Sequence, residues 1–192
     1  MKGINSTLTA KQKGTFSIEF SLVGLFFGVL LMFSADIIIK LSVKGKLDRL
    51  SYSLVSIAKE RTQLYAAENY TLVEQADDGD EATVEQQDIS LLYTVAKNSL
   101  SRTVGQFDNN KFSMLVEEIT NESGYQAHKT YAGSCGESLS ENSLAALRVK
   151  TSWGRDSSIY RVTLCYETDN MVAGLLDNGF TRVQSSSAMI GR

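Results

Sequence analysis

Residues 11 to 20 read KQKGTFSIEF and open the only long apolar run in the chain. Between Lys13 and Lys40 lie 26 residues whose only charged side chains are Glu19 and Asp36. As a helix these residues would extend roughly 39 Å, which exceeds the ~30 Å hydrocarbon core of a bilayer. The stretch between the two carboxylates is only 16 residues long, so we expect both carboxylates near the membrane interfaces. The run predicts a membrane-spanning helix.

Composition limits what the rest of the chain can be. With 192 residues, of which 43% are hydrophobic, it can bury one modest core. The formal net charge is −3 and no basic stripe with interleaved aromatic residues occurs, which argues against nucleic acid as a partner. The chain has no proline, although average usage predicts about ten. No helix is therefore broken by a proline ring.

A cleaved secretory signal is the first alternative to a permanent anchor. Three lysines precede the apolar run, as they do in signal peptides. However, Phe33 stands where a small residue should precede Ala35, and the apolar run continues through residues 37–39. The usual signal peptidase would find a poor site here, so the pattern favours an anchored chain.

The orientation of this anchor depends on the cysteines. Basic residues flank the apolar run on both sides, so the positive-inside rule does not settle it. Cys135 and Cys165 are the only cysteines, and both follow the run. Such a pair in a small domain favours a disulfide in an oxidising compartment, with the C-terminal part outside the cytoplasm. Two buried free thiols in a cytosolic domain are the alternative.

The junction at residues 11–20 resembles the cleavage site of type IV prepilins, in which basic residues, Gly14, four further residues and Glu19-Phe20 follow one another. The resemblance implies that a prepilin peptidase cuts between Gly14 and Thr15 on the cytoplasmic side and leaves the apolar helix in place. Glycine suits this position because it has no Cβ and lets a protease approach the backbone. The resemblance also implies that Glu19, with Phe20 beside it, serves assembly by meeting the N-terminal amine of a neighbouring subunit. The alternative is a solvated Glu19 at the headgroup level.

Among prepilin families, the short leader, the GTFSIEF junction, the head size and the cysteine pair most resemble the TadE/TadF minor pseudopilins, TadF above all, of the tight-adherence (Tad/Flp) type IVb pilus system. The specific part of this resemblance covers residues 11–40, and one departure is that Thr15 rather than an aromatic residue follows the cut. The resemblance implies a bacterial inner-membrane protein with a periplasmic head, in contact with lipid, which supports surface adhesion and biofilm formation. Its implied partners are a TadV-like prepilin peptidase, the major Flp pilin, a TadE-like pseudopilin and the pilus assembly platform.

The expected fold is α+β, with a long N-terminal helix packed on a small head that contains an antiparallel sheet. We divide the chain into a leader (1–14), a membrane-spanning and amphipathic helix (15–72) and an extracytoplasmic head (73–192). Gly45 weakens the joint between the two halves of the helix by about 1 kcal/mol and could let it bend. The apolar stripe predicted for the amphipathic half comprises Leu47, Leu50, Leu54, Ile57, Leu64 and Tyr65.

Periodicity also predicts the elements of the head. Asp88 should cap a helix that ends near Gly105. Alternating residues predict an antiparallel hairpin of strands 147–153 and 159–167 with one buried face. Asp169 should cap a short helix over residues 171–176. The expected buried face of the first helix is Ile89, Leu92, Tyr93, Ala96 and Leu100, and further strands are expected at 112–119 and 180–190.

Candidates for chemistry are few. Four acidic residues surround Gly79, but their spacing does not match a calcium loop, and a solvated loop is the better interpretation. His128, the only histidine, has no partner at metal-ligand spacing and is expected in a polar loop. We therefore expect no enzyme, no metal and no cofactor. The alternatives are a bitopic membrane-anchored sensor whose head binds a ligand and a membrane-tethered enzyme.

Overall fold

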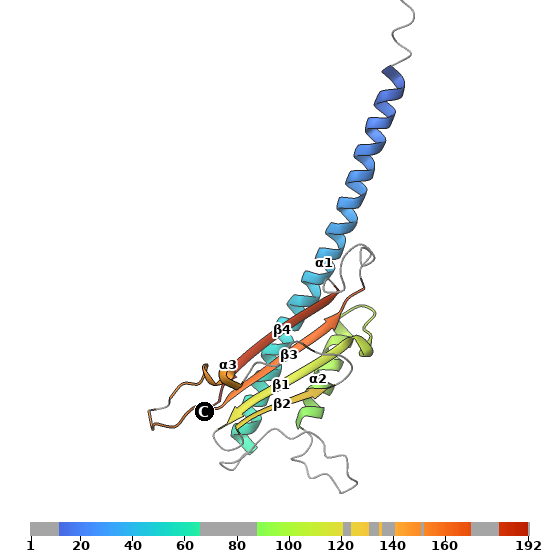
Figure 1. Ribbon diagram of the computed structural model, residues 1–192. Helices are drawn as coiled ribbons and strands as arrows, with labels where there is room; N and C mark the ends of the chain where they lie inside the picture. Colours follow the sequence, from blue (N-terminus) through green and yellow to red (C-terminus); the bar gives the residue numbers. More distant parts are fainter. Residues whose placement is uncertain are drawn as a thin grey trace, which may run out of the picture.

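The computed structural model describes residues 12–65, 88–120, 124–130, 135, 141–150, 152–169 and 181–191. Within them a long N-terminal helix packs on a small head with a four-stranded antiparallel sheet, which confirms the predicted α+β class. The elements, in chain order, are α1 (Gln12–Tyr65), α2 (Asp88–Thr103), η2 (Asn109–Lys111), β1 (Phe112–Thr120), β2 (Gly124–Thr130), α3 (Glu141–Ala145), β3 (Ile159–Glu167) and β4 (Arg182–Ile190) (Figure 1).

The helix α1 is continuous over 54 residues, which corresponds to about 80 Å. Its N-terminal half extends away from the head, whereas its C-terminal half lies along the sheet (Figure 1). The helix continues through Gly45, where we expected a weak joint. The apolar segment and the segment that packs on the head therefore belong to one helix.

The stripe of α1 that faces the head differs in part from the predicted one. Leu47 and Leu54 are fully buried, as predicted, but Ile57 is 37% exposed. The buried face is centred on positions near Ser51 and Ala58, neither of which is exposed, and Ile57 lies just beyond its edge. A pattern based on large apolar residues misses a polar Ser51 at the centre of the contact. The side chains of Leu64 and Tyr65 lie outside the described part of the structure.

The sheet has the strand order β2-β1-β3-β4, and all neighbouring strands are antiparallel. One face packs against α1 and α2 and forms the main core. The helix predicted from Asp88 to near Gly105 and the strands predicted at 112–119, 159–167 and 180–190 are confirmed, with bounds that differ by at most two residues from those above. The residues that contribute most to this core are Leu47, Leu54, Ile89, Leu92, Leu100, Phe112, Met114, Val116, Val162 and Leu164.

The predicted hairpin of 147–153 with 159–167 is wrong. Both sides of β3 are already hydrogen-bonded, to β1 and to β4, so no edge is left for another strand. Leu147 and Val149 are exposed, and a single isolated bridge joins Lys150 to Asp156. Local alternation in the sequence cannot show whether a strand edge is available.

The structure also contains a strand that the sequence did not predict. β2 pairs with β1 over seven residues and contains His128, which therefore lies in a strand and not in the expected polar loop. Its sequence, GYQAHKT, lacks apolar alternation, so only the partner strand identifies it. The predicted helix at 171–176 falls outside the described residues.

Candidate membrane anchor and assembly site

The N-terminal half of α1 is an exposed apolar rod. Among the described residues, it belongs to the single helix that is long and apolar enough to cross a membrane. Only 6% of the most apolar 18-residue stretch of this helix is buried inside the protein. A helix from the core of a soluble protein would be mostly buried, and soluble proteins rarely expose apolar patches of this extent. The large apolar side chains exposed here include Phe16, Ile18, Phe20, Leu22, Leu25, Phe26, Phe27, Leu31, Ile38 and Leu41.

The predicted processing and assembly residues all lie in the first turns of α1. Gly14 and Thr15 are helical in backbone, and the side chain of Thr15 is outside the described part of the structure. Glu19 is exposed among apolar neighbours, and the rings of Phe16 and Phe20 stack at 6.5 Å between centroids. Thr15 and Glu19 are one helical turn apart, so an amine formed at Thr15 would lie on the same face of α1, about 6 Å along the helix axis from Glu19.

The second carboxylate of the apolar run behaves differently. Asp36 is only 1% exposed, although Ala35 before it is exposed. We expected both carboxylates near membrane interfaces, and burial of Asp36 within the protein was not part of that expectation. Asp36 attracts Lys40, which follows it by one helical turn. The protein therefore begins to cover α1 before the apolar run ends.

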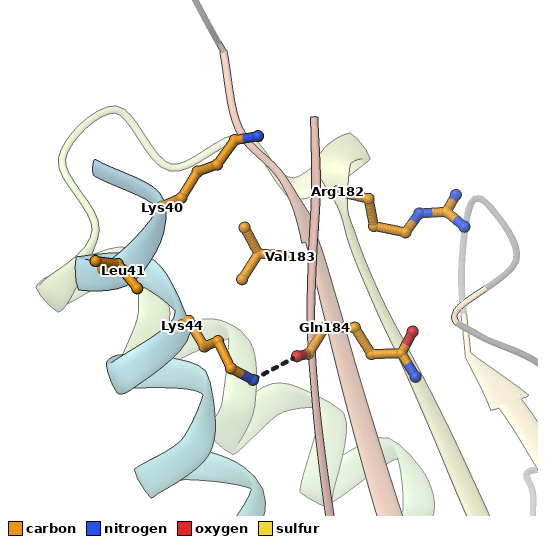
Figure 2. A pocket seen from close by; sticks show the side chains of 6 residues that line it. All are labelled: Lys40, Leu41, Lys44, Arg182, Val183 and Gln184. Carbon is orange, nitrogen blue, oxygen red and sulfur yellow. Dashed lines mark hydrogen bonds between the residues drawn. The ribbon is translucent and has the colours of Figure 1, made fainter. Parts of the chain in front are cut away.

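C-terminal to Asp36, hydrogen bonds between polar groups join α1 to β4. Lys44 Nζ donates a hydrogen bond to the Gln184 carbonyl oxygen at 3.2 Å (Figure 2). The Ser51 hydroxyl is hydrogen-bonded to the Ser185 hydroxyl at 3.1 Å and to the Ser187 hydroxyl at 2.8 Å. Because serine side chains are small, the helix can approach the strand closely, and their hydroxyl groups satisfy one another's hydrogen bonds. This explains why β4, which is rich in serine, shows only weak strand character in its sequence.

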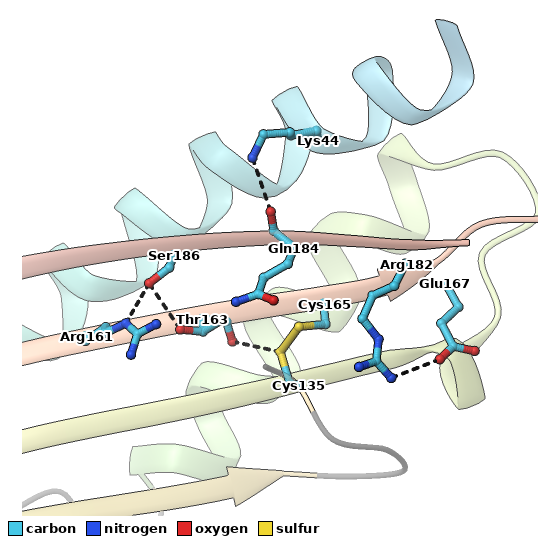
Figure 3. Close-up of a disulfide and its surroundings, with 9 residues drawn as sticks. All are labelled: Lys44, Cys135, Arg161, Thr163, Cys165, Glu167, Arg182, Gln184 and Ser186. Carbon is cyan, nitrogen blue, oxygen red and sulfur yellow. Dashed lines mark hydrogen bonds and ion pairs between the residues drawn. A yellow bond between two sulfur atoms is a disulfide. The ribbon is translucent and has the colours of Figure 1, made fainter. Parts of the chain in front are cut away.

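The disulfide joins Cys135 to Cys165, with 5.4 Å between the Cα atoms and a sequence separation of 30. This confirms the predicted pair. Figure 3 shows the bridge on the face of the sheet that is opposite to α1, where the cysteines pack with Leu115. The Cys135 sulfur lies 3.5 Å from the Thr163 carbonyl oxygen, which is a contact because a bridged sulfur has no proton to donate. The bridge therefore fastens a distant segment over β3.

On the two central strands, β1 and β3, this second face of the sheet is buried as well. We expected one buried face, but eight of the nine residues of β3 are buried. A fully buried Glu117 accepts a hydrogen bond from Arg161 Nη1 at 2.7 Å and another from the Tyr125 hydroxyl at 2.9 Å. Arg161 Nε also donates to the Ser186 hydroxyl at 2.7 Å (Figure 3). Charged residues at alternate positions of two strands suggest exposure, so the sequence did not reveal this cluster.

The end of the sheet nearest the apolar rod carries paired charges. Lys111 Nζ donates to both carboxylate oxygens of Asp169, at 2.6 and 2.7 Å. This hydrogen bonding raises the pKa of Lys111. Arg182 Nη2 donates to Glu167 at 3.3 Å across the β3–β4 ladder. These two ion pairs are at least partly solvent-exposed, so they contribute little to stability.

Candidates for metal binding receive no support from the described side chains. No group of three or more His, Cys, Asp or Glu side chains is placed to hold a metal ion among the residues whose positions are described. The acidic cluster around Gly79 lies outside these residues.

Comparison with known protein families adds one match of nearly full length. The family model of TadF, the tight adherence pilin protein F, matches residues 7–192. No curated protein and no solved structure matches the chain.

Proposed function

Because the chain belongs to the TadF family of tight adherence pilins, we propose that it is a minor pilin that a prepilin peptidase cleaves and that supports assembly or priming of a tight-adherence pilus. The single observation that carries this proposal is the continuous α1 helix. One half is an exposed apolar rod and the other half is the spine of the head. This arrangement leaves the rod available for lipid before assembly and for neighbouring helices afterwards.

The processing step of the proposal concerns the start of α1. Residues 1–14 would be the leader, 15–72 the membrane-spanning and amphipathic helix, and 73–192 the extracytoplasmic head. Cleavage between Gly14 and Thr15 removes three lysines and no acid, which changes the formal net charge from −3 to −6. It also creates a cationic amine one turn from Glu19.

The assembly step assigns a role to Glu19. A carboxylate surrounded by apolar side chains is costly in hydrocarbon unless it has a partner. The amine of Thr15 on a neighbouring subunit would supply that partner, and Phe20 would pack beside it. The partners we propose are the major Flp pilin, a TadE-like pseudopilin, a TadV-like peptidase and the assembly platform. A structural role in the pilus accounts for both the anchor and the bridged head.

The orientation of the head is also a proposal. The disulfide between Cys135 and Cys165 favours an oxidising compartment, so the head would lie in the periplasm with α1 crossing the inner membrane once. Incorporation into a pilus would carry the head to the cell surface, where it could contribute to adhesion and biofilm formation.

Intact-mass measurement of the protein extracted from membranes tests the proposal. We expect the native chain to begin at Thr15. Replacement of Gly14 by a bulky residue, as in Gly14→Trp, should block processing but not membrane insertion. Gly24→Leu is the matched control, because Gly24 lies in the same rod and an added Cβ meets no neighbour there. A chain that still begins at Met1 in cells with an active prepilin peptidase would contradict the proposal.

A further inference from the structure

A short loop between α3 and β3 projects from the end of the head that is away from the apolar rod (Figure 1). We call it the distal loop; its described residues are 147–150 and 152–157. Hydrogen bonds to the buried Ser157 fix its base. Ser157 N–H donates to the Val149 carbonyl oxygen at 3.0 Å, and the Ser157 hydroxyl accepts from Val149 N–H at 3.0 Å. The Ser157 carbonyl oxygen accepts from Arg148 Nε at 2.9 Å, so the base of the loop is fastened to the head.

Trp153, the only tryptophan in the chain, lies at the tip of the distal loop and is 88% exposed. An antiparallel bridge between Lys150 and Asp156 brings the two arms of the loop together just below this tip. Gly154 has a φ of 76°, a left-handed conformation that glycine adopts without strain and that turns the chain next to Trp153. A Cβ added at Gly154 would meet no atom within 4 Å, so the space beside the tip is open.

Trp153 is part of a concentration of exposed apolar side chains. Leu147 is 51% exposed and Val149 is 55% exposed on the same loop. A single exposed apolar residue is ordinary on a protein surface, but three within seven residues, one of them an indole, form a contact surface for a ligand. The fold itself gains almost no burial from the indole.

Charged side chains of both signs accompany the indole. Lys150 and Asp156 are directly opposite across the bridge, so their side chains leave the loop on the same face. Arg155 is exposed two residues after Trp153. The tip therefore offers N–H donors and carboxylate acceptors close to an aromatic ring. This combination suits a ligand rich in hydroxyl groups, because a hydroxyl both donates and accepts hydrogen bonds.

We propose that the distal loop binds a polysaccharide, with the indole of Trp153 stacked on the face of a pyranose ring. The C–H groups on that face carry a partial positive charge and are attracted to the negative face of the indole. Lys150, Arg155 and Asp156 bond the hydroxyl groups at the edge of the ring. The outward position of the loop rests on the proposed function, in which the head lies outside the cytoplasm, and several copies of the chain on one polymer would bind it more tightly than one.

Other classes of ligand fit the distal loop less well. A stable protein interface buries about 800 Å² on each partner, which is more than a tip of this size offers. A tip that inserts into a membrane would carry apolar residues on both sides of Trp153, where this chain has Ser152 and Gly154. The carboxylate of Asp156 would also repel anionic lipid headgroups and nucleic-acid phosphates.

Tryptophan fluorescence of the purified full chain tests this proposal, because all tryptophan emission comes from Trp153. The chain is kept in a polyoxyethylene detergent, which has no sugar headgroup. Titration with cellohexaose or hexagalacturonic acid, a neutral and an acidic chain of pyranose rings, should shift the emission to shorter wavelength and reach saturation. Polyaspartate, a polyanion without sugar rings, should produce no shift.

Variants measured by affinity electrophoresis in gels that contain polygalacturonate separate the indole from the rest of the chain. Trp153→Ala should weaken binding by roughly tenfold or more, because the indole supplies most of the apolar contact, whereas Trp153→Tyr should retain part of it. Tyr52→Ala is the matched control, since Tyr52 is an aromatic residue that is 61% exposed but lies on α1, and it should bind normally. An unchanged Tm shows that each variant is folded.

Four outcomes would overturn the polysaccharide site. They are no shift with either hexasaccharide, an equal shift with polyaspartate, undiminished binding by Trp153→Ala, and short-wavelength emission before any sugar is added. The second would indicate binding by charge alone, and the last would indicate a tip that inserts into detergent or contacts a second copy. Because the assay uses purified chain, it is independent of cleavage at Gly14 and of pilus assembly. A defect in those steps with intact sugar binding would contradict only the proposed function.

Discussion

Glu117 on β1 and Arg161 on β3 are direct partners in the sheet register, and their side chains form an ion pair of 2.7 Å in which the Glu117 side chain is fully buried. The Tyr125 hydroxyl and the Ser186 hydroxyl complete the hydrogen bonds of this pair. Burial of two charges is costly, so the pair is stable only because each charge has its partners. It ties together β1 and β3 directly, β2 through Tyr125 and β4 through Ser186.

Glu117→Ala should therefore destabilise the head by about 3–5 kcal/mol, because it leaves the Arg161 charge buried without its carboxylate. Thermal unfolding of the full chain in detergent measures this loss. Glu167→Ala is the matched control, since Glu167 also pairs with an arginine across two strands, but on the surface. We expect that control to change stability by less than about 1 kcal/mol. Equal losses in the two variants would mean that burial of the first pair is not what makes it important.

A second prediction tests the face of α1 that packs on the head. Leu54→Ala should cost about 2–5 kcal/mol, because Leu54 is fully buried in the core and its removal leaves a cavity. Ile57→Ala, one turn along the same helix, should cost less than about 1 kcal/mol, since Ile57 is 37% exposed and alanine favours the helix. Denaturant unfolding in detergent compares the two variants. A larger loss for Ile57→Ala would restore the stripe expected from the sequence alone.

The sequence predicted the elements whose burial follows a simple period. The helix beginning at Asp88 and the strand at 159–167 bury large apolar residues at regular spacing, whereas the exposed apolar rod was predicted from the length of its apolar run; all three are present. The pairing of Cys135 with Cys165 was also predictable, because no other cysteine exists. These features depend on local pattern or composition.

The remaining features depend on contacts between distant segments. β2 exists because β1 offers it an edge, and residues 147–153 are excluded because β3 has no edge left. Ser51 and Glu117 are buried because hydroxyl and guanidinium groups reach them from other elements. A polar residue gives no sign in the sequence of whether such a partner exists.

For assembly, we expect Glu19→Ala to leave membrane insertion and cleavage intact but to impair pilus formation. Loss of a carboxylate makes the exposed rod more apolar, so anchoring should not weaken. What is lost is the proposed partner for the amine of Thr15 on another subunit. Cell fractionation, intact mass and adherence assays measure the three steps separately.

The controls for this prediction lie in the same turns of α1. Glu19→Asp keeps the charge and should assemble in part, whereas Ser17→Ala alters a neighbouring exposed polar residue and should assemble normally. Fibre and adherence at wild-type levels in Glu19→Ala would show that Glu19 is only an interfacial group.

The last prediction concerns the bridge between Cys135 and Cys165, which closes a loop with a sequence separation of 30 residues. In the chain-entropy model, closing such a loop contributes about 3–4 kcal/mol, a large share of the stability of a small domain. Cys165→Ser, alone or with Cys135→Ser, should therefore lower the Tm of the head by roughly 10–20 °C and reduce its abundance, while α1 stays in the membrane. Reductant should lower the Tm of the wild type similarly and leave the double variant unchanged. Alkylation of protein from cells, denatured without reductant, supplies the decisive measurement. Two alkyl groups per chain would show free thiols in the cell and would remove the main support for a periplasmic head.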